Sequence, residues 1–286
     1  MSIFRTIDQS RTMNDSMASF ARWTAFECIL PFLICGYTMT ECLMAEDDLA
    51  DRFEKLAFES SDKQALPYRF LKPAAPQADQ KYPLVVFLHG AGERGNDNVA
   101  PLVHGVKIFA SDEFLQKYPC YVIVPQCPAE LKWVDVDWTL DASTMPAEPT
   151  EPMRWTIELV DKLIQDLPID PNRLYITGLS MGGFGAWDAI VRYPDKFAAA
   201  APVCGGGDPA QAKLCFNTSV WAFHGAKDQA VKVMRSREMI DAMKALGGKP
   251  RYTEFPDVGH DSWNPAYKTA ELYEWMFTQQ KVAVTK

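Results

Sequence analysis

The sequence predicts an α/β fold in which helices cover both faces of a doubly wound, mostly parallel sheet. Short apolar runs recur along the chain and segments of helical periodicity separate them. The runs are continuously apolar, which is typical of strands buried on both faces. Because helices join parallel strands by right-handed crossovers, the alternation itself indicates a doubly wound sheet. The central runs lie at 84–89, 121–125, 174–177, 198–203 and 220–224.

Further elements extend the sheet and cover it. The runs at 53–58 and 68–71 predict two antiparallel strands on one edge, and a further strand is expected at 252–255. Thr150 followed by Pro152 is a helix start signal, because proline is tolerated in a first turn. Two more helices are expected at 231–246 and 267–279.

Composition excludes several classes of protein. The chain has 286 residues, of which 48% are apolar and 23% charged, which is ordinary for a soluble globular protein. Lys and Arg number 29 against 37 Asp and Glu, a net charge of −8, and no basic cluster stands out. We therefore expect no nucleic-acid partner. No linker or repeat divides the chain, so one catalytic domain is expected over 46–286.

The first 45 residues resemble a secretory leader. An apolar stretch runs from Trp23 to Met39 and follows Arg22. The stretch is interrupted by polar and helix-breaking residues, which argues against a stable membrane span of about 20 residues. A signal peptide over 1–45 predicts a periplasmic or secreted protein. The alternative is a buried or disordered N-terminal segment.

Four of the seven cysteines follow that leader. A strand separates Cys120 from Cys127 and would hold them too far apart to be bridged. Cys204 and Cys215 flank a loop that can fold back, so a disulfide between them and two buried thiols are both open alternatives.

The strongest motif is Gly178-Leu-Ser-Met-Gly-Gly, a G-x-S-x-G directly after a strand and directly before a helix. A turn this tight requires small residues on both sides of the serine, and it raises the serine oxygen above the edge of the sheet. Ser180 is therefore the predicted nucleophile. The alternative is a glycine-rich turn with an idle serine.

A serine nucleophile requires a base and an orienting acid. Asp228 follows the strand at 220–224, and His260 lies in the loop before the last helix, which gives the order Ser, Asp, His. Asp257 and Asp261 are weaker rivals, because they lie too close in sequence to orient His260 easily. Asp228 could also act only as a helix cap.

The remaining histidines have supporting positions. His89 and His224 each end a strand as His-Gly, where a supporting role is expected, and His104 is expected on a surface or pocket rim. The glycine-rich loop after His89 predicts an oxyanion donor at the amide of Ala91, with Met181 as the second donor. The nucleotide-binding glycine patterns are missing from this loop.

The walls of the site are expected from loops. The longest loop, 126–149, holds Trp133 and Trp138, which could stack on a sugar or phenolic ring of a substrate or else pack in the core. The chemistry requires neither a metal nor a cofactor, so none is expected.

The loop HGAGERG, the turn GLSMGG, the segment WAFHGAKD and the ending GHDSW together resemble the esterase and polyhydroxybutyrate-depolymerase-like branch of the α/β-hydrolases. This branch includes feruloyl and acetyl-xylan esterases and phospholipase/carboxylesterase-type proteins. The resemblance covers about 53–279 and implies a triad of Ser180, Asp228 and His260 with oxyanion donors Ala91 and Met181. Only about 40 residues separate the helix after Ser180 from the strand at 220–224, too few for a cap domain.

These observations predict a serine esterase that hydrolyses short-chain or aromatic acyl esters through an acyl-enzyme. Its substrate is expected to be a small-molecule or polysaccharide-linked ester. Three alternatives stand beside it: a serine peptidase of the prolyl-oligopeptidase type, an acyltransferase, and a binding module on an inactive hydrolase scaffold.

Overall fold

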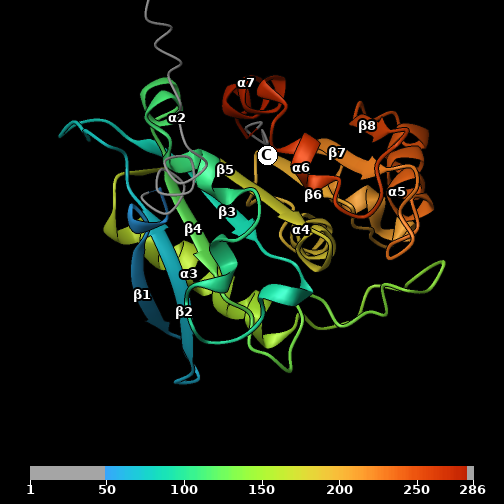
Figure 1. Cartoon of the computed structure of the whole chain (residues 1–286), viewed down its shortest axis with the longest axis horizontal. Coiled ribbons are helices and arrows are strands. Elements are labelled where there is room, and N and C mark those ends of the chain that lie inside the picture. Colours follow the sequence, from blue (N-terminus) through green and yellow to red (C-terminus); the bar gives the residue numbers. More distant parts are fainter. Residues whose placement is uncertain (1–48, 282–286) are drawn as a thin grey trace, which may run out of the picture. The chain divides into compact units, whose positions relative to one another are not determined.

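An eight-stranded sheet forms the centre of the computed structural model, which describes residues 49–281 (Figure 1). The strand order is β1-β2-β4-β3-β5-β6-β7-β8. The edge pair β1 and β2 is antiparallel, β2 joins β4 antiparallel, and all the other neighbours are parallel. The predicted doubly wound, mostly parallel sheet is confirmed. The leader predicted over 1–45 lies outside the described residues.

The strands have the following bounds: β1 Glu54–Glu59, β2 Ala65–Leu71, β3 Tyr82–Leu88, β4 Tyr121–Pro125, β5 Ile169–Leu179, β6 Ala199–Val203, β7 Ser219–Gly225 and β8 Arg251–Phe255. The α-helices are α2 Asp112–Lys117, α3 Glu151–Asp166, α4 Met181–Arg192, α5 Met234–Ala245, α6 Trp263–Ala266 and α7 Ala270–Thr278. Short 3-10 helices are η1 Ala91–Glu93, η2 Ala100–Leu102, η3 Val106–Ala110 and η4 Pro209–Cys215.

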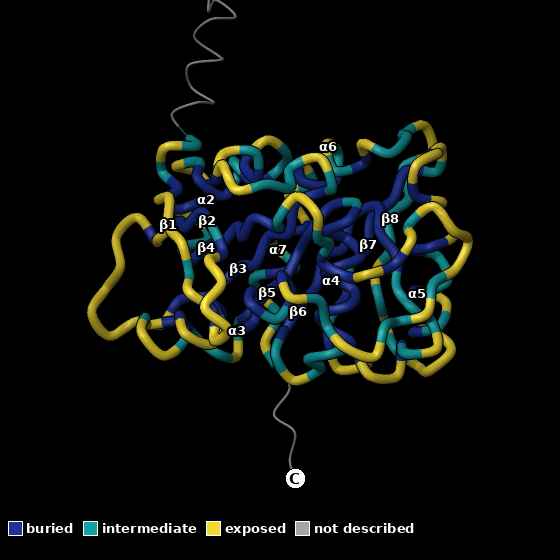
Figure 2. Tube along the Cα trace, turned by 90° about the horizontal axis from the view of Figure 1, so that it is seen from below, coloured by how far each residue is buried: buried dark blue, intermediate teal, exposed yellow. Residues whose placement is uncertain are grey.

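Two apolar cores lie on opposite faces of the sheet. On one face α3, α4 and α5 pack against alternate strand residues such as Leu84 and Val86. On the other face η3, α2 and α7 pack against the intervening residues, including Val85 and Phe87. The central strands are buried along their length, whereas exposed residues concentrate in the connecting loops (Figure 2). This double burial is the physical reason for their continuous apolarity.

Two helices differ from the sequence prediction. Helix α5 begins at Met234, because the Asp228 side chain binds the amides of Ala230 and Val231 in a separate turn. The helix predicted at 267–279 is α7, which begins only at Ala270, because Tyr267 belongs to the turn that follows the short helix α6, and α6 was not predicted. The Tyr267 carbonyl accepts a hydrogen bond from the Tyr273 hydroxyl.

The short helix α2 has no counterpart in the prediction. It contains only six residues, so it offers little helical periodicity to detect. Thr150 occupies the predicted position before α3, but its hydroxyl donates to the Trp133 carbonyl at 2.9 Å instead of capping the helix.

The structure also shows the state of the cysteines and the lengths of the helices. Within residues 49–281 the cysteines are buried free thiols, so Cys204 and Cys215 are not bridged in this structure. None of the helices in the described part of the chain has the length and apolar character that crossing a bilayer requires.

Candidate active site

Ser180 lies at a sharp turn between β5 and α4. Its backbone has φ 53° and ψ −117°, a strained conformation for a residue with a side chain. Glycines make the turn sterically feasible, because a Cβ on Gly182 would come within 2.0 Å of the Leu88 carbonyl oxygen. The same atom on Gly178 would lie 2.4 Å from the Gly182 oxygen. The strain is typical of a nucleophile raised above a parallel sheet.

The structure brings Ser180, His260 and Asp228 together in one hydrogen-bonded chain. His260 Nε2 lies 2.9 Å from Ser180 Oγ, and His260 Nδ1 lies 2.8 Å from Asp228 Oδ2. The carboxylate accepts from Nδ1–H, which leaves Nε2 free to accept the serine proton. Asp228 lies 32 positions before His260 in the chain, and Ser180 lies 80 positions before it. They meet because each follows the carboxyl end of a strand in the same parallel sheet.

Asp228 is buried and fully hydrogen-bonded. Its Oδ1 accepts from the amides of Ala230 and Val231 at 2.8 and 2.9 Å, while Oδ2 faces both His260 and His224. Burial alone would raise the pKa of Asp228. Hydrogen bonds from His224, His260 and the Val231 amide outweigh burial and hold this pKa well below its usual range. The carboxylate is therefore ionised wherever the imidazole works as a base.

The rival acids lie elsewhere. Asp257 is exposed and pairs with the Lys227 ammonium at 2.7 Å, and Asp261 is exposed beside His260. The position predicted for the acid, Asp228, is thus the carboxylate that contacts His260. Its capping of the turn at 230–231 is a second role of the same side chain, because the two oxygens serve different partners.

Two backbone amides are available as oxyanion donors. Met181 is the first residue of α4, and Ala91 is the first residue of η1. The first amides of a helix lack an intrahelical acceptor, so both can point to a ligand. Leu88 of β3 pairs with Gly178 of β5, which brings the loop after β3 beside Ser180. Met181 thus follows Ser180 directly, Ala91 lies in the loop after the neighbouring strand, and their role as oxyanion donors stays a prediction.

Residues of the HGAGERG motif hold the Ala91 loop in place. The Arg94 Nε donates to the Ala91 carbonyl at 2.9 Å. Gln126 Nε2 donates to the Glu93 carbonyl at 3.1 Å, and the Gly95 amide donates to the Cys127 carbonyl at 2.9 Å. Backbone groups of this motif and the Gln126 side chain thus fix the loop to the segment after β4, a role that the glycine pattern alone did not reveal.

His89 forms hydrogen bonds to the same loop and to the segment after β4. It is buried, its Nε2 accepts from the Cys127 amide at 3.0 Å, and its Nδ1 donates to the Gly90 carbonyl at 2.6 Å. Burial lowers the pKa of His89 to about 4. The predicted supporting role is consistent with these contacts, because a neutral ring satisfies both partners.

We expect the depressed pKa of His89 to make the protein less stable in acid. An unfolded histidine binds a proton below about pH 6.5, whereas folded His89 stays neutral down to about pH 4. The unfolded state binds more protons in this window, so the free energy of unfolding falls as pH falls through it, by about 3 kcal/mol. Urea unfolding at pH 7 and pH 4 measures the loss, and His89→Gln should reduce it. An equal loss in the variant and in the native chain would contradict this origin.

The structure contradicts the substrate-binding role predicted for Trp133. Its side chain is fully buried, its Nε1 donates to the His89 carbonyl at 3.0 Å, and its ring packs edge-on against the His89 ring. A Cβ on Gly185 of α4 would come within 2.7 Å of the Trp133 Cβ. Trp133 is a core residue behind the Ala91 loop, because the loop 126–149 folds back over α4.

Trp138 is half-buried. It packs against the apolar cluster of Val134, Val136, Phe184 and Val231, and the Lys132 ammonium lies 5.2 Å from its ring centroid. These contacts neither place it against a substrate nor exclude one, so its substrate-binding role stays a prediction.

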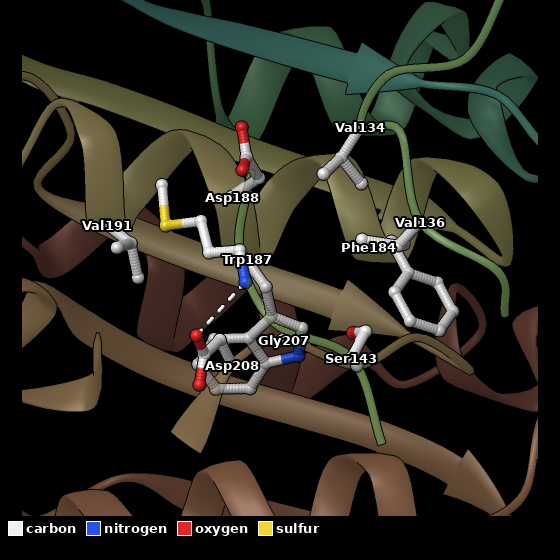
Figure 3. Close-up of a pocket in the computed structure, with 11 residues that line it drawn as sticks. Val134, Val136, Ser143, Phe184, Trp187, Asp188, Val191, Gly207 and Asp208 are labelled. Atoms are coloured by element: carbon white, nitrogen blue, oxygen red, sulfur yellow. Dashed lines mark hydrogen bonds between the residues drawn. The ribbon is translucent and has the colours of Figure 1, made fainter. Parts of the chain in front are cut away.

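A small cavity lies beneath the loop 126–149. Figure 3 shows that its lining comes from that loop, from α4 and from the segment after β6. The Met145 amide donates a hydrogen bond of 3.0 Å to the Asp208 carboxylate. Within the described chain the buried Trp187 Nε1 and Asp188 Oδ1 that line it have no hydrogen-bond partner. Its volume of about 20 Å³ holds one water molecule, too little for an acyl group.

The aromatic residue that the structure places beside His260 is Trp263. The two rings lie 5.3 Å apart and almost perpendicular. His104 packs on the other side of Trp263 at 5.2 Å, and its Nε2 lies 3.6 Å from the Glu93 carboxylate. The His104 side chain is 37% exposed, which is consistent with the surface position predicted for it, whereas its place on a pocket rim stays a prediction. Trp263 was not predicted as a site residue, although the GHDSW ending contains it.

The described residues contain one cluster with the ligand types of a metal site. Ligand atoms of Cys204, Asp228 and His260 lie within 4.8 Å of one another. Burial raises the pKa of the Cys204 thiol far above its usual range, which keeps it protonated, and metals bind the thiolate. The carboxylate and the imidazole already bind each other. The donor set therefore fits the hydrogen-bonded chain better than a metal.

Solved structures share this fold. A crystal structure of a thermostable esterase is 38% identical, has a TM-score of 0.76 and covers 82% of this chain and 64% of its own. A ferulic acid esterase with a TM-score of 0.58 and 19% identity covers 79% of this chain and 97% of its own, which shows similarity of fold alone.

Sequence comparison gives the family. A bifunctional acetylxylan esterase/xylanase of Neocallimastix patriciarum is 28% identical over 133 residues, which are 46% of this chain and 19% of that protein. The chain thus spans less than two thirds of the length of the relatives it matches. The model of the phospholipase/carboxylesterase family matches residues 74–273, from the segment before β3 to α7. That stretch holds Ser180, Asp228 and His260, so the chain belongs to the phospholipase/carboxylesterase family.

Proposed function

We propose that this protein is a serine carboxylic-ester hydrolase that works through an acyl-enzyme. The observation that carries the proposal is the hydrogen-bonded chain from Ser180 Oγ through His260 to the buried Asp228 carboxylate, with distances of 2.9 and 2.8 Å. A serine with a base in contact and an acid behind the base is the arrangement that makes an alcohol nucleophilic at neutral pH.

Acylation begins when Ser180 Oγ attacks the ester carbonyl and His260 Nε2 takes its proton. The negative charge that develops on the carbonyl oxygen is bound by the amides of Ala91 and Met181, and the first turn of α4 adds its positive dipole end. The Asp228 carboxylate holds His260 in the reactive tautomer and stabilises the imidazolium. His260 then gives the proton to the leaving alcohol, and the acyl group stays on Ser180.

Deacylation repeats the same steps with water as the nucleophile. His260 removes a proton from the water that attacks the acyl-enzyme, the two amides bind the second oxyanion, and the proton returns to Ser180 Oγ. The free acid leaves. Neither half of the cycle needs a cofactor.

Short-chain or aromatic acyl esters are the proposed substrates, including carbohydrate-linked ones. Between α4 and β7 the chain forms only β6 and η4, which agrees with the prediction of a site without a cap domain. Each methylene that a site leaves in water forgoes about 0.8 kcal/mol of burial, so a site without a cap favours short or flat acyl groups. The proposal of carbohydrate-linked esters is supported by the acetylxylan esterase relative. A secreted or periplasmic location rests on the leader predicted over 1–45.

An ester panel tests the proposal. We expect acetyl and feruloyl esters to be cleaved with a higher kcat/KM than esters whose acyl chain has twelve or more carbons, measured at equal concentration below micelle formation. The reason is that a long acyl chain left in water gains no burial energy from the site. A clear preference for the long acyl chains would contradict the proposed substrate class without contradicting the mechanism.

Two further measurements separate the alternatives. A fluorophosphonate probe should label Ser180, whereas an inactive binding module would stay unlabelled. Product analysis with and without a sugar acceptor distinguishes hydrolysis from acyl transfer, and an acyl-peptide substrate distinguishes an esterase from a peptidase. Peptide cleavage faster than ester cleavage would replace the proposed reaction.

A further inference from the structure

A second histidine contacts the acid of the proposed triad. His224 lies near the end of β7 and is fully buried. Its Nε2 lies 3.2 Å from Asp228 Oδ2 and 3.0 Å from the Val231 carbonyl oxygen. The oxygen that faces His224 is the same one that accepts from His260 Nδ1. One carboxylate oxygen thus lies between two imidazole rings.

The neighbours of His224 determine where its proton lies. A carbonyl and an ionised carboxylate accept hydrogen bonds and cannot donate them, so Nε2 must carry a proton to satisfy either. That proton is within reach of two acceptors: it forms the hydrogen bond to the Val231 carbonyl oxygen, and the Asp228 carboxylate lies 3.2 Å from the same nitrogen. On the other side of the ring, Nδ1 lies 2.8 Å from the Ser236 hydroxyl. The surroundings of the ring therefore place a proton on Nε2.

Ser236 fixes the far side of the ring to two other parts of the fold. It is buried on α5, and its Oγ lies 2.9 Å from the Gly205 carbonyl oxygen as well as from His224 at 2.8 Å. Gly205 in turn packs against Gly183 of α4, since a Cβ there would come within 2.4 Å of the Gly183 carbonyl carbon. The chain of contacts connects the acid to the helix that follows Ser180.

His224 completes the set of donors around Asp228. Oδ1 is held by the amides of Ala230 and Val231, and without His224 the other oxygen would be held by His260 alone. His260 is part of the loop between β8 and α6, and it exchanges protons with serine, leaving alcohol and water in turn. A carboxylate fixed from a strand keeps the His260 ring in one direction through these transfers.

We propose that His224, fixed by Ser236, is a positioning residue that holds Asp228 Oδ2 in the direction His260 requires. His224 does not touch the substrate or Ser180 and acts only through Asp228. The inference rests on the proposed function, because it assigns His224 a part in the same serine, histidine and aspartate chemistry.

Three variants test the role of His224. His224→Phe keeps an aromatic ring in place and removes the polar contacts of both ring nitrogens. It should lower kcat on p-nitrophenyl acetate about 10- to 100-fold, with KM changed less than about twofold. His224→Gln keeps a donor near the position of Nε2 and should recover kcat to within about fivefold of the native enzyme. Ser236→Ala leaves the ring without its anchor and should lower kcat about three- to tenfold.

Thr156→Val is the matched control. Thr156 is also fully buried and hydrogen-bonded, to the Pro152 carbonyl within α3, but it has no contact with the site residues. It should reduce stability and leave kcat per folded molecule unchanged. All rates are divided by the folded fraction, measured by circular dichroism.

The outcomes separate positioning from simple destabilisation. The inference is overturned if His224→Phe keeps kcat within twofold, if KM rises as much as kcat falls, or if His224→Gln is no better than His224→Phe. If His224→Phe does not fold, Ser236→Ala decides: a kcat lowered threefold or more supports the inference and an unchanged kcat overturns it. Ser180→Ala, measured in parallel, reports on the proposed function itself. Full loss there with an unaffected His224→Phe rejects only the role of His224.

Discussion

Replacing Ser180 or His260 by alanine is expected to lower kcat for a short acyl ester by about 10⁴- to 10⁶-fold. The residues of a catalytic triad act as a unit, so the loss of one member removes most of the rate enhancement. The loss should be nearly the same for either single variant and for the double variant. Without Ser180 Oγ there is no nucleophile, and without His260 Nε2 the serine keeps its proton at neutral pH. Hydrolysis of p-nitrophenyl acetate by each purified variant, with urea unfolding to show that the fold is intact, measures the effect.

A serine away from the site provides the control. Ser111 caps α2 by accepting from the Phe114 amide, so Ser111→Ala should cost about 1 kcal/mol of stability and leave kcat as it was. If Ser180→Ala kept a tenth of the native activity, the nucleophile would have to be sought elsewhere in the chain.

Replacing Asp228 by asparagine is expected to lower kcat about 10⁴-fold with little change in KM. The asparagine amide can donate to His260 Nδ1, which favours the tautomer whose proton lies on Nε2, and that tautomer cannot accept a proton from Ser180. The isosteric change also removes the negative charge that stabilises the imidazolium. The kcat and KM of the variant, measured on the same ester, check this expectation.

Asp257→Asn is the matched comparison, because Asp257 is the nearby carboxylate whose recorded partner is a surface lysine. An exposed pair of this kind is worth about 0–1 kcal/mol, so the variant should keep both its activity and its stability. A loss of activity in Asp257→Asn that matched or exceeded the loss in Asp228→Asn would show that the acid has been assigned to the wrong residue.

The sheet could be predicted from the sequence because burial on both faces leaves a local signature. The five central strands appear as continuous apolar runs, and the run at 121–125 coincides with β4. Local signals were weaker where an element is short or its end depends on a distant contact. Helix α5 begins later than predicted because Asp228 organises the turn before it, and α7 begins later than predicted because Tyr267 follows the short helix α6. Such contacts have no trace in the periodicity.

The tryptophans show the same limit at the site. Trp133 was predicted to bind substrate and Trp263 was not assigned a role, although their side chains do not differ in chemistry. Trp133 is fully buried because the loop 126–149 folds onto α4, whereas Trp263 lies against His260. Which of two like residues meets the solvent depends on what covers it, and that is a property of the assembled fold.

The class of fold, the turn that carries Ser180, and the order in which Asp228 and His260 follow could all be predicted from the sequence. A turn as tight as the one at Ser180 demands glycines at set positions, and parallel strands bring their carboxyl ends to one edge. The position of Asp228 Oδ2 between His260 and His224, and the contact of Ser236 with the second ring, became visible only in the folded chain. Hydrogen bonds of about 3 Å between residues on different elements depend on side-chain directions, which packing sets and sequence spacing does not.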